Sequence, residues 1–488
     1  MSSYRHTINI SLVSHTNVGK TTLARTLLKR DIGEIGDRPH VTALPEPHLL
    51  QRDAQSNALI LWDTPGFGDS IRLAKRLKQR ANPIGWFLAE VWDRWMARPL
   101  WSSQQAMKNV RDHADVVLYL VNASESPAAV AYVEAEMQIM AWLDKPVIVL
   151  LNQIGQPRPK EAEQADFTAW QSFMGRYSFV KDVISMDAFA RCWVVEMALF
   201  DAVGQALPAA QRSVFEGLKK AWADERMAVY QQSIGALAEF LSALMTDCEH
   251  LQSEGFLQTI KRKIGWSNGN EVAPEAFAME SLAQRAALRM KQLTDQLIEL
   301  NGLKGEAAKQ ILERVEQSVR VDDEVSEGAA GVAGAVVSGA LAGLAADLMA
   351  GGLTLGTGAL AGAVLGGLGF AGIAKGYNLW TGKDGTLVRW NELSIEHFFV
   401  DAILLYLAVA HFGRGRGEWI QSECPAHWRE EVLRVVSQDA ANVPKITNER
   451  ALDRSLLKTE LNDCVKWAID HVLRNLYPES RVLAEYAK

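Results

Sequence analysis

The segment from Thr7 to Leu28 constrains the fold more than any other part of the chain. An apolar run, Thr7–Ile10, leads into the turn-rich stretch Ser11–Leu23, and the helix-forming residues Ala24–Leu28 follow directly. A strand, a tight turn and a helix N-terminus in this order point backbone amides and the helix dipole at an anion. The sequence therefore predicts a phosphate-binding loop.

The spacing of residues in this loop fits the pattern G-x-x-x-x-G-K-[ST] in its second half, with Gly19, Lys20 and Thr21. Lys20 is predicted to contact the β- and γ-phosphates, and the Thr21 hydroxyl to bind Mg²⁺. Ser14 stands where the pattern has its first glycine, and a small serine fits there if the backbone does not need a positive φ. The alternative is a chance Gly-Lys-Thr in a turn.

A second motif, Asp63-Thr-Pro-Gly66, follows a buried strand predicted at Ala58–Trp62. The two motifs, in this order and spacing, resemble those of the Era-like, translation-factor-related GTPases. The resemblance implies that Asp63 holds Mg²⁺ through water and that the Gly66 amide meets the γ-phosphate. It also implies that Thr42, in a switch I loop over residues 31–45, covers the metal and the γ-phosphate.

Phe67 occupies the position at which Ras-like enzymes carry the glutamine that orients the attacking water. An apolar residue cannot perform that task. Era-like relatives also have a hydrophobic residue there, and many recruit a potassium ion through an asparagine of the phosphate loop. Asn17 occupies the matching position, so the resemblance implies K⁺-assisted hydrolysis. The alternative is an ordinary loop asparagine that tolerates an unusual φ.

The base-recognition motif of the family, N-K-x-D, is matched only in part by Asn152-Gln-Ile-Gly155. Gly155 lacks the carboxylate that accepts two hydrogen bonds from guanine, and losing both weakens guanine discrimination by about 10² to 10⁴. Whether Glu161 or another nearby carboxylate replaces the missing guanine-binding aspartate is left open by the sequence. Ser185-Met-Asp187 lies where the family has S-A-K.

These motifs give a predicted nucleotide site. The catalytic residues are Lys20, Thr42 and Gly66; the nucleotide-binding residues are Ser14, Asn17, Val18, Gly19, Lys20, Thr21, Thr22, Asn152 and Ser185; Thr21, Thr42 and Asp63 are the Mg²⁺ ligands, and Asn17 is the K⁺ ligand.

Residues 1–205 alternate between strand-like and helical patterns, which predicts an α/β domain with a doubly wound, mainly parallel sheet. The predicted strands lie near residues 7–13, 58–63, 115–122 and 146–151, and their continuous apolar runs are typical of a sheet covered on both faces. Nucleotide is expected at the carboxyl ends of these strands.

An extension of switch II is predicted at residues 69–105. It begins with a basic helical segment, Arg72–Arg80, and continues with Trp86, Phe87, Trp92, Trp95 and Trp101. Basic residues followed by aromatics suit contact with an anionic membrane surface or a partner. The alternative is a helical insert that packs its tryptophans on the nucleotide domain.

Residues 206–327 and 377–488 are helical in composition. Leu237, Phe240, Leu241 and Leu244 recur at helical spacing and predict a buried stripe. The apolar run His397–Phe412 contains Asp401 and is shorter than a membrane span, so a core helix is expected there.

Between these helical regions, residues 328–376 are nearly free of charge and rich in glycine and alanine. The pentapeptide Gly-Ala-Leu-Ala-Gly occurs twice, at 339–343 and 358–362, and Asp347 interrupts the run. The segment resembles the glycine-zipper hairpins of membrane-inserting proteins, with close helix contact as in G-x-x-x-G. The alternative is a soluble hairpin buried under neighbouring helices.

Composition limits the class of protein. A chain of 488 residues suggests roughly three units, and a net charge of -7 argues against nonspecific nucleic-acid binding, so no nucleic-acid partner is expected. The four cysteines lack C-x-x-C spacing, and the N-terminus lacks an apolar export segment. The expected location is the cytoplasm, at the inner face of the cell membrane if residues 328–376 bind lipid.

The whole pattern resembles bacterial proteins in which an Era-like GTPase domain is fused to a helical C-terminal domain of uncharacterised function. The hypothesis is a GTP/GDP-binding protein that hydrolyses GTP and whose nucleotide state controls the helical region. Further partners would be membrane lipid through residues 328–376 and a second protein or second copy. The alternative is a nucleotide-binding scaffold that does not hydrolyse and has a soluble helical domain.

Overall fold

The structure is a computed structural model in which the chain forms two compact units. The residues that it describes are 4–29, 32, 44–79, 81–89, 98–127, 129–152, 160–186, 192–250, 274–303, 377–382, 385–411, 426–438 and 454–477. Unit 1 comprises residues 1–228, 410–420 and 479–488, and unit 2 comprises residues 229–409 and 421–478. The predicted boundaries at 205, 327 and 376 remain predictions.

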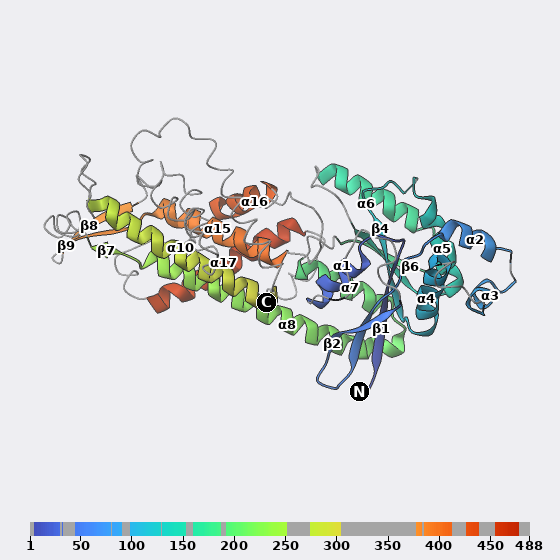
Figure 1. Ribbon diagram of the computed structural model, residues 1–488. Helices are drawn as coiled ribbons and strands as arrows, with labels where there is room; N and C mark the ends of the chain where they lie inside the picture. The colour runs from blue at the N-terminus through green and yellow to red at the C-terminus, as the bar shows by residue number, and fades with distance from the viewer. Residues whose placement is uncertain are drawn as a thin grey trace, which may run out of the picture. The chain divides into compact units, whose positions relative to one another are not determined.

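Unit 1 contains a six-stranded sheet in the order β2-β3-β1-β4-β5-β6 (Figure 1). All neighbouring strands are parallel except β2 and β3. The doubly wound, mainly parallel sheet predicted from the sequence is confirmed. The strands are β1 (Thr7–Ser14), β2 (Glu46–Arg52), β3 (Ala58–Asp63), β4 (Val116–Asn122), β5 (Val147–Asn152) and β6 (Val180–Ser185).

Helices cover both faces of this sheet (Figure 1), because alternate residues of each strand point to opposite sides. Ile10 and Leu12 of β1 join a core with helices α1, α7 and the start of α8. Val13 joins a second core with α2, α3, α4, α5 and α6. The helices are α1 (Lys20–Leu28), α2 (Ser70–Leu77), α3 (Pro83–Ala89), α4 (Arg98–Asp112), α5 (Ala131–Leu143), α6 (Lys160–Met174), α7 (Trp193–Ala206) and α8 (Ala209–Met245).

The edge strand β2 was not predicted. Its sequence, EPHLLQR, has neither a continuous apolar run nor a clean alternation, and most of its residues are exposed or half-buried. Antiparallel pairing with β3 holds it in the sheet, with Glu46 opposite Asp63. An edge strand is hydrogen-bonded to a neighbouring strand along one edge only, so a polar sequence can form it.

The switch II extension folds as the helices α2, α3 and α4. Leu73, Ala74 and Leu77 form the buried face of α2, and Trp86 packs against the same core. The packing of Trp86 agrees with the alternative in which the extension is a helical insert that packs its tryptophans on the nucleotide domain. Trp92 and Trp95 lie outside the described residues.

Unit 2 is mainly helical, as predicted. It contains the part of α8 from Val229 onward, α10 (Pro274–Leu300), α15 (Glu392–Ala410), α16 (Ala426–Gln438) and α17 (Arg454–Leu476). The sequence also predicted helix after residue 377, but the chain there forms a hairpin of β8 (Tyr377–Gly382) and β9 (Gly385–Trp390).

This hairpin is completed by β7 (Glu249–His250), giving the order β7-β9-β8. Glu249 pairs with Val388 although well over a hundred residues separate them in the chain. The helical prediction for this stretch failed because β-branched and aromatic residues find a strand partner that only the tertiary structure supplies.

The predicted stripe of α8 is buried. Leu237, Leu241 and Leu244 are at most 1% exposed, and the rings of Phe240 and Phe398 lie 6.3 Å apart between centroids. The apolar helix α15 also lies in the core, as predicted. Among the described residues, no helix combines the length and apolarity that a membrane crossing requires.

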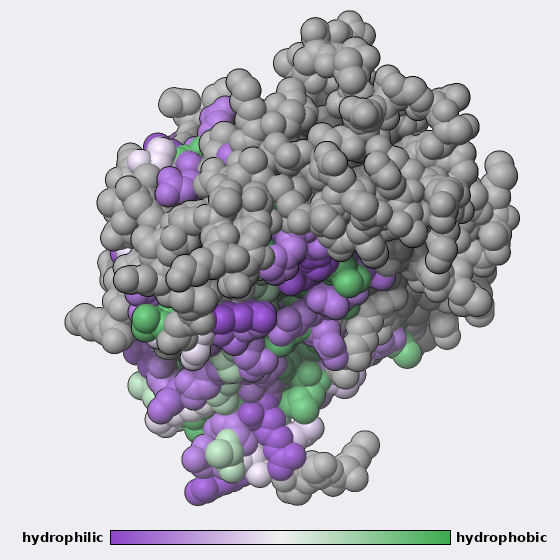
Figure 2. Space-filling model, turned by 90° about the vertical axis from the view of Figure 1, so that its left-hand side faces the viewer, coloured by the Kyte–Doolittle hydropathy of each residue, from purple (hydrophilic) through white to green (hydrophobic). Residues whose placement is uncertain are grey.

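Figure 2 shows a face on which hydrophilic side chains predominate among the coloured residues, with small hydrophobic groups between them. The predicted glycine-zipper segment, residues 328–376, lies outside the described residues. Its membrane role therefore remains a prediction.

We expect Leu237→Ala to destabilise unit 2 by about 2 to 5 kcal/mol, because it leaves a cavity at a residue with 0% exposure. The matched control is Leu456→Ala in α17, where Leu456 is 54% exposed and a change within about 0.5 kcal/mol is expected. Urea unfolding followed by circular dichroism measures both. Equal effects of the two substitutions would contradict the burial of the stripe.

Candidate nucleotide-binding site

The phosphate loop joins the end of β1 to the start of α1. Gly19 caps the helix with φ 92°, a left-handed conformation that favours glycine. Asn17 also has a positive φ, 65°, whereas Ser14 does not. The serine in place of the first glycine is therefore tolerated, as the sequence predicted, and the unusual φ of Asn17 agrees with its alternative as a plain loop residue.

Lys20 lies inside the loop and is 8% exposed. Its Nζ donates to Ser14 Oγ at 3.0 Å and to the His15 carbonyl oxygen at 3.5 Å. Burial lowers the pKa of Lys20, while the carboxylates of Asp63 and Glu136 oppose that shift. The loop thus holds a poorly solvated ammonium group among oxygen acceptors, which is an arrangement suited to a phosphate.

The two predicted Mg²⁺ ligands that the structure describes, Thr21 and Asp63, meet directly. Thr21 Oγ1 donates to Asp63 Oδ2 at 2.7 Å, where α1 begins and β3 ends. Asp63 is 3% exposed. A hydroxyl and a carboxylate oxygen are the hard donors that Mg²⁺ prefers, so these residues fit a magnesium ion; Thr42 lies outside the described residues.

Gly66 and Phe67 lie against the phosphate loop. A Cβ at Gly66 would be 2.9 Å from Thr16 Cα and 3.1 Å from Lys20 Nζ, so this close approach requires glycine. The Phe67 amide donates to the Ser14 carbonyl at 2.9 Å, and the Thr16 amide donates to the Phe67 carbonyl at 3.2 Å. The backbones of the two motifs are therefore hydrogen-bonded to each other.

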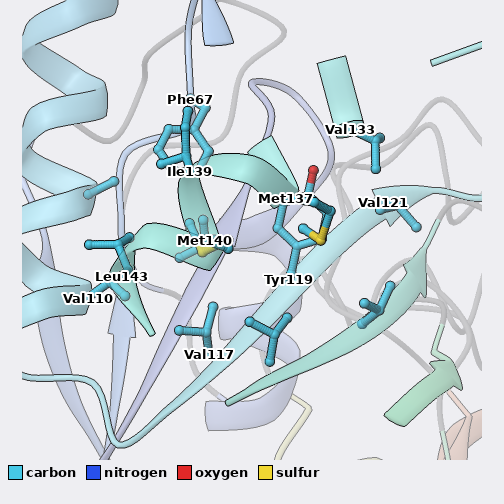
Figure 3. Close-up of a cluster of buried hydrophobic side chains, with 14 of the residues drawn as sticks. Phe67, Val110, Val117, Tyr119, Val121, Val133, Met137, Ile139, Met140 and Leu143 are labelled. Carbon is cyan, nitrogen blue, oxygen red and sulfur yellow. The ribbon is translucent and has the colours of Figure 1, made fainter. Parts of the chain in front are cut away.

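The Phe67 side chain is fully buried. Figure 3 shows it in the second core, with Ile139 and Met140 of α5 in the same cluster. The ring serves as a packing residue, so the position that carries glutamine in Ras-like enzymes offers no polar group here.

Asn152 connects the base-recognition motif to the phosphate loop. It is fully buried at the end of β5, and its Nδ2 donates to the Val18 carbonyl at 2.6 Å. Ser185 ends β6, beside Leu151 of β5. Gly155 and Asp187 lie outside the described residues, and the side chain of Glu161 is not described.

The structure therefore brings most of the predicted site together at the carboxyl ends of the parallel strands. Val18 and Thr22 are buried beside the loop at 4% and 7% exposure. Among the described residues, no group of three or more His, Cys, Asp or Glu side chains could hold a metal. A metal in this site would depend on threonine hydroxyls and Asp63.

Sequence reasoning missed a cluster next to the loop. His15 Nδ1 lies 2.7 Å from Glu136 Oε1, and the Tyr119 hydroxyl donates to Glu136 Oε2 at 2.6 Å. The available signal was the helical spacing of Glu136, which places this carboxylate on the same buried side of α5 as Val133, Met137 and Met140, whereas Glu134 is exposed.

The N-terminal and C-terminal parts of the chain match two different protein families. Residues 176–463 match the family described as "Domain of unknown function (DUF3482)", which is more than half of the chain. The chain belongs to the DUF3482 family. Residues 9–153 match the family described as "50S ribosome-binding GTPase". The two matches confirm the predicted combination of a GTPase domain of the Era type with a C-terminal domain of uncharacterised function.

The curated relatives include "GTPase Era" from two strains of Clostridium botulinum, Hall and ATCC 19397. Each is 27% identical over 158 residues, which is 32% of this chain and 43% of the relative. The chain therefore spans less than half the length of these relatives.

Solved structures similar to the chain include an Era variant from Aquifex aeolicus bound to GDP and AlF4⁻. The TM-score is 0.30 at 20% identity, over 42% of this chain and 57% of that one. Another is Era with MgGDPNP and a 16S ribosomal RNA segment, with a TM-score of 0.31 at 19% identity over the same shares.

We expect Phe67→Gln to destabilise unit 1 by roughly 2 to 5 kcal/mol, because it buries an amide and removes a fully buried ring. The control Ile71→Gln, at a residue with 41% exposure, should change stability by less than about 0.5 kcal/mol. Thermal unfolding measures both. A Phe67→Gln variant as stable as the control would contradict the packing role of the ring.

Proposed function

We propose that this protein binds GTP and GDP and hydrolyses GTP to GDP and phosphate. One observation carries the proposal: the ammonium of Lys20, the Thr21–Asp63 pair and the Gly66 backbone converge on one loop at the carboxyl ends of β1 and β3. The GTPase family match over residues 9–153 and the relatives named GTPase Era support it.

In the proposed reaction, water attacks the γ-phosphate in line with the leaving oxygen. Lys20 stabilises negative charge on the phosphates, and the Gly66 amide donates to the γ-phosphate. Thr21, Thr42 and Asp63 would hold Mg²⁺, which supplies charge neutralisation between the β- and γ-phosphates. Because Phe67 is buried, no side chain at position 67 orients the water, and unaided turnover is slow.

The resemblance to Era-like proteins adds K⁺ at Asn17 as a second source of positive charge. The side-chain oxygen of an asparagine is a suitable hard donor for such an ion. The left-handed φ of Asn17 agrees equally with a plain loop role, so the salt dependence of turnover decides between the two.

We expect Lys20→Ala to reduce GTP turnover to the uncatalysed background, because it removes the buried ammonium. The measurement is phosphate release from GTP and from ATP, each with Mg²⁺, in KCl and in NaCl. The control Lys75→Ala alters an exposed residue of α2 and should retain wild-type turnover. K⁺ stimulation that is lost in Asn17→Ala would support the K⁺ role.

A second candidate function, a nucleotide-binding scaffold, is favoured by the buried Phe67. Wild-type protein that binds nucleotide and releases no phosphate in either salt would overturn the hydrolysis proposal and leave the scaffold.

Equal turnover of GTP and ATP would show that the chain lacks guanine preference, as expected from Gly155 in place of the family's aspartate.

We further propose that the nucleotide state controls the helical region and that residues 328–376 contact membrane lipid. The support is the composition of that segment, whose charged residues are Asp347 and Lys375 alone, and the position of the switch II extension directly after Gly66. We expect the full chain to sediment with anionic phosphatidylglycerol vesicles, more with MgGDPNP than with MgGDP, and a chain lacking 328–376 to remain in the supernatant.

Equal sedimentation of the two chains would overturn the lipid contact.

The solved Era structure contains 16S ribosomal RNA, whereas the net charge of this chain, -7, predicts no nucleic-acid partner. Salt-sensitive binding of a ribosomal RNA segment would contradict that prediction.

A further inference from the structure

Glu136 is a buried carboxylate next to the phosphate loop. It lies on α5 with no exposed surface. Its two oxygens accept from different elements: Oε2 from the Tyr119 hydroxyl of β4, and Oε1 from His15 Nδ1. Removing a carboxylate from water costs several kcal/mol unless hydrogen bonds compensate, so an apolar residue would fill this core position at lower cost.

His15 is held by α5 in two ways. Its ring stacks on Tyr132 with centroids 4.4 Å apart and an interplanar angle of 29°, and its Nδ1 meets Glu136 at 2.7 Å. Tyr132 is fixed in turn, because its hydroxyl donates to Glu125 at 3.1 Å. These contacts fix both the position and the rotation of the imidazole.

The backbone of His15 forms part of the cradle for Lys20. Its carbonyl oxygen accepts from Ser14 Oγ and lies 3.5 Å from Lys20 Nζ. The residues on either side, Ser14 and Thr16, exchange backbone hydrogen bonds with Phe67. A shift of the His15 peptide would therefore move the lysine acceptors and the backbone link to the Gly66 motif together.

We propose that Glu136 is a positioning residue of the nucleotide site, which fixes the first turn of the phosphate loop by holding the His15 side chain. The inference rests on the proposed nucleotide binding but not on hydrolysis. In this proposal the Glu136 carboxylate on α5 orients the His15 imidazole. The backbone carbonyl of His15 in turn helps to position the Lys20 ammonium, which binds phosphate. Glu136 itself does not touch the phosphate.

The test compares variants that differ in one hydrogen bond. His15→Ala removes the contact with Glu136, whereas His15→Asn loses the ring but retains a donor, because the asparagine amide nitrogen can take the place of Nδ1. We expect the Kd for Mg·GDP to rise about tenfold in His15→Ala, which corresponds to about 1.4 kcal/mol. In His15→Asn, the Kd should stay within about threefold of wild type.

Two more variants complete the design. Glu136→Leu should raise the Kd for Mg·GDP about tenfold, and adding His15→Ala to it should raise the Kd by less than about threefold further, because both act through one contact. The control His113→Ala removes a histidine that stacks on Trp62 with centroids 4.8 Å apart, and it should retain the wild-type Kd.

Isothermal titration calorimetry gives the Kd, and thermal unfolding without nucleotide shows whether each variant folds. If Glu136→Leu fails to fold, the two His15 variants still decide the question. Variants that unfold at lower temperature but bind Mg·GDP with the wild-type Kd would overturn the inference and leave Glu136 a structural residue. Wild-type protein that binds no nucleotide would overturn the proposed function and this inference with it.

Discussion

The nucleotide site depends on the burial of the Lys20 ammonium at the end of β1. A charge so poorly solvated is stable only among acceptors and opposite charges, and the structure supplies Ser14, the His15 carbonyl, Asp63 and Glu136. Ser14 and His15 lie where β1 meets the phosphate loop, Asp63 ends β3, and Glu136 lies on α5. The need to satisfy one cation therefore joins the phosphate loop, the end of β3 and helix α5 into a single site.

The parallel sheet makes this convergence possible. Its central strands β1, β4 and β5 are buried on both faces, so helices cover both sides, and each connection from a strand to the following helix begins at the carboxyl end of the strand. Polar residues that end β1, β3 and β5 then meet there, although they are far apart in the sequence. The same layering places Phe67 in the core behind the loop, where its ring packs with α5.

Helix α5 therefore has two roles in the structure. Met137 and Met140 pack in the core with Phe67 and the switch II extension, while Glu136 and Tyr132 face His15 of the phosphate loop. Backbone hydrogen bonds between Phe67 and the loop connect these two sides. A shift of the loop would therefore displace both the extension and α5, and these contacts support the nucleotide-dependent response proposed above.

The sequence by itself determined the elements whose signals are local. The phosphate loop follows from a strand, a glycine and a lysine within a short segment, and the buried stripe of α8 follows from helical spacing. The tertiary structure alone decided the pairings between distant residues: His15 with Glu136, 121 positions apart, β7 with the hairpin β8–β9, and the polar edge strand β2 with β3. Periodicity and spacing show which side of an element is buried, but they do not show which other element covers it. A buried charge or a short strand becomes favourable only through that partner, and folding supplies the partner.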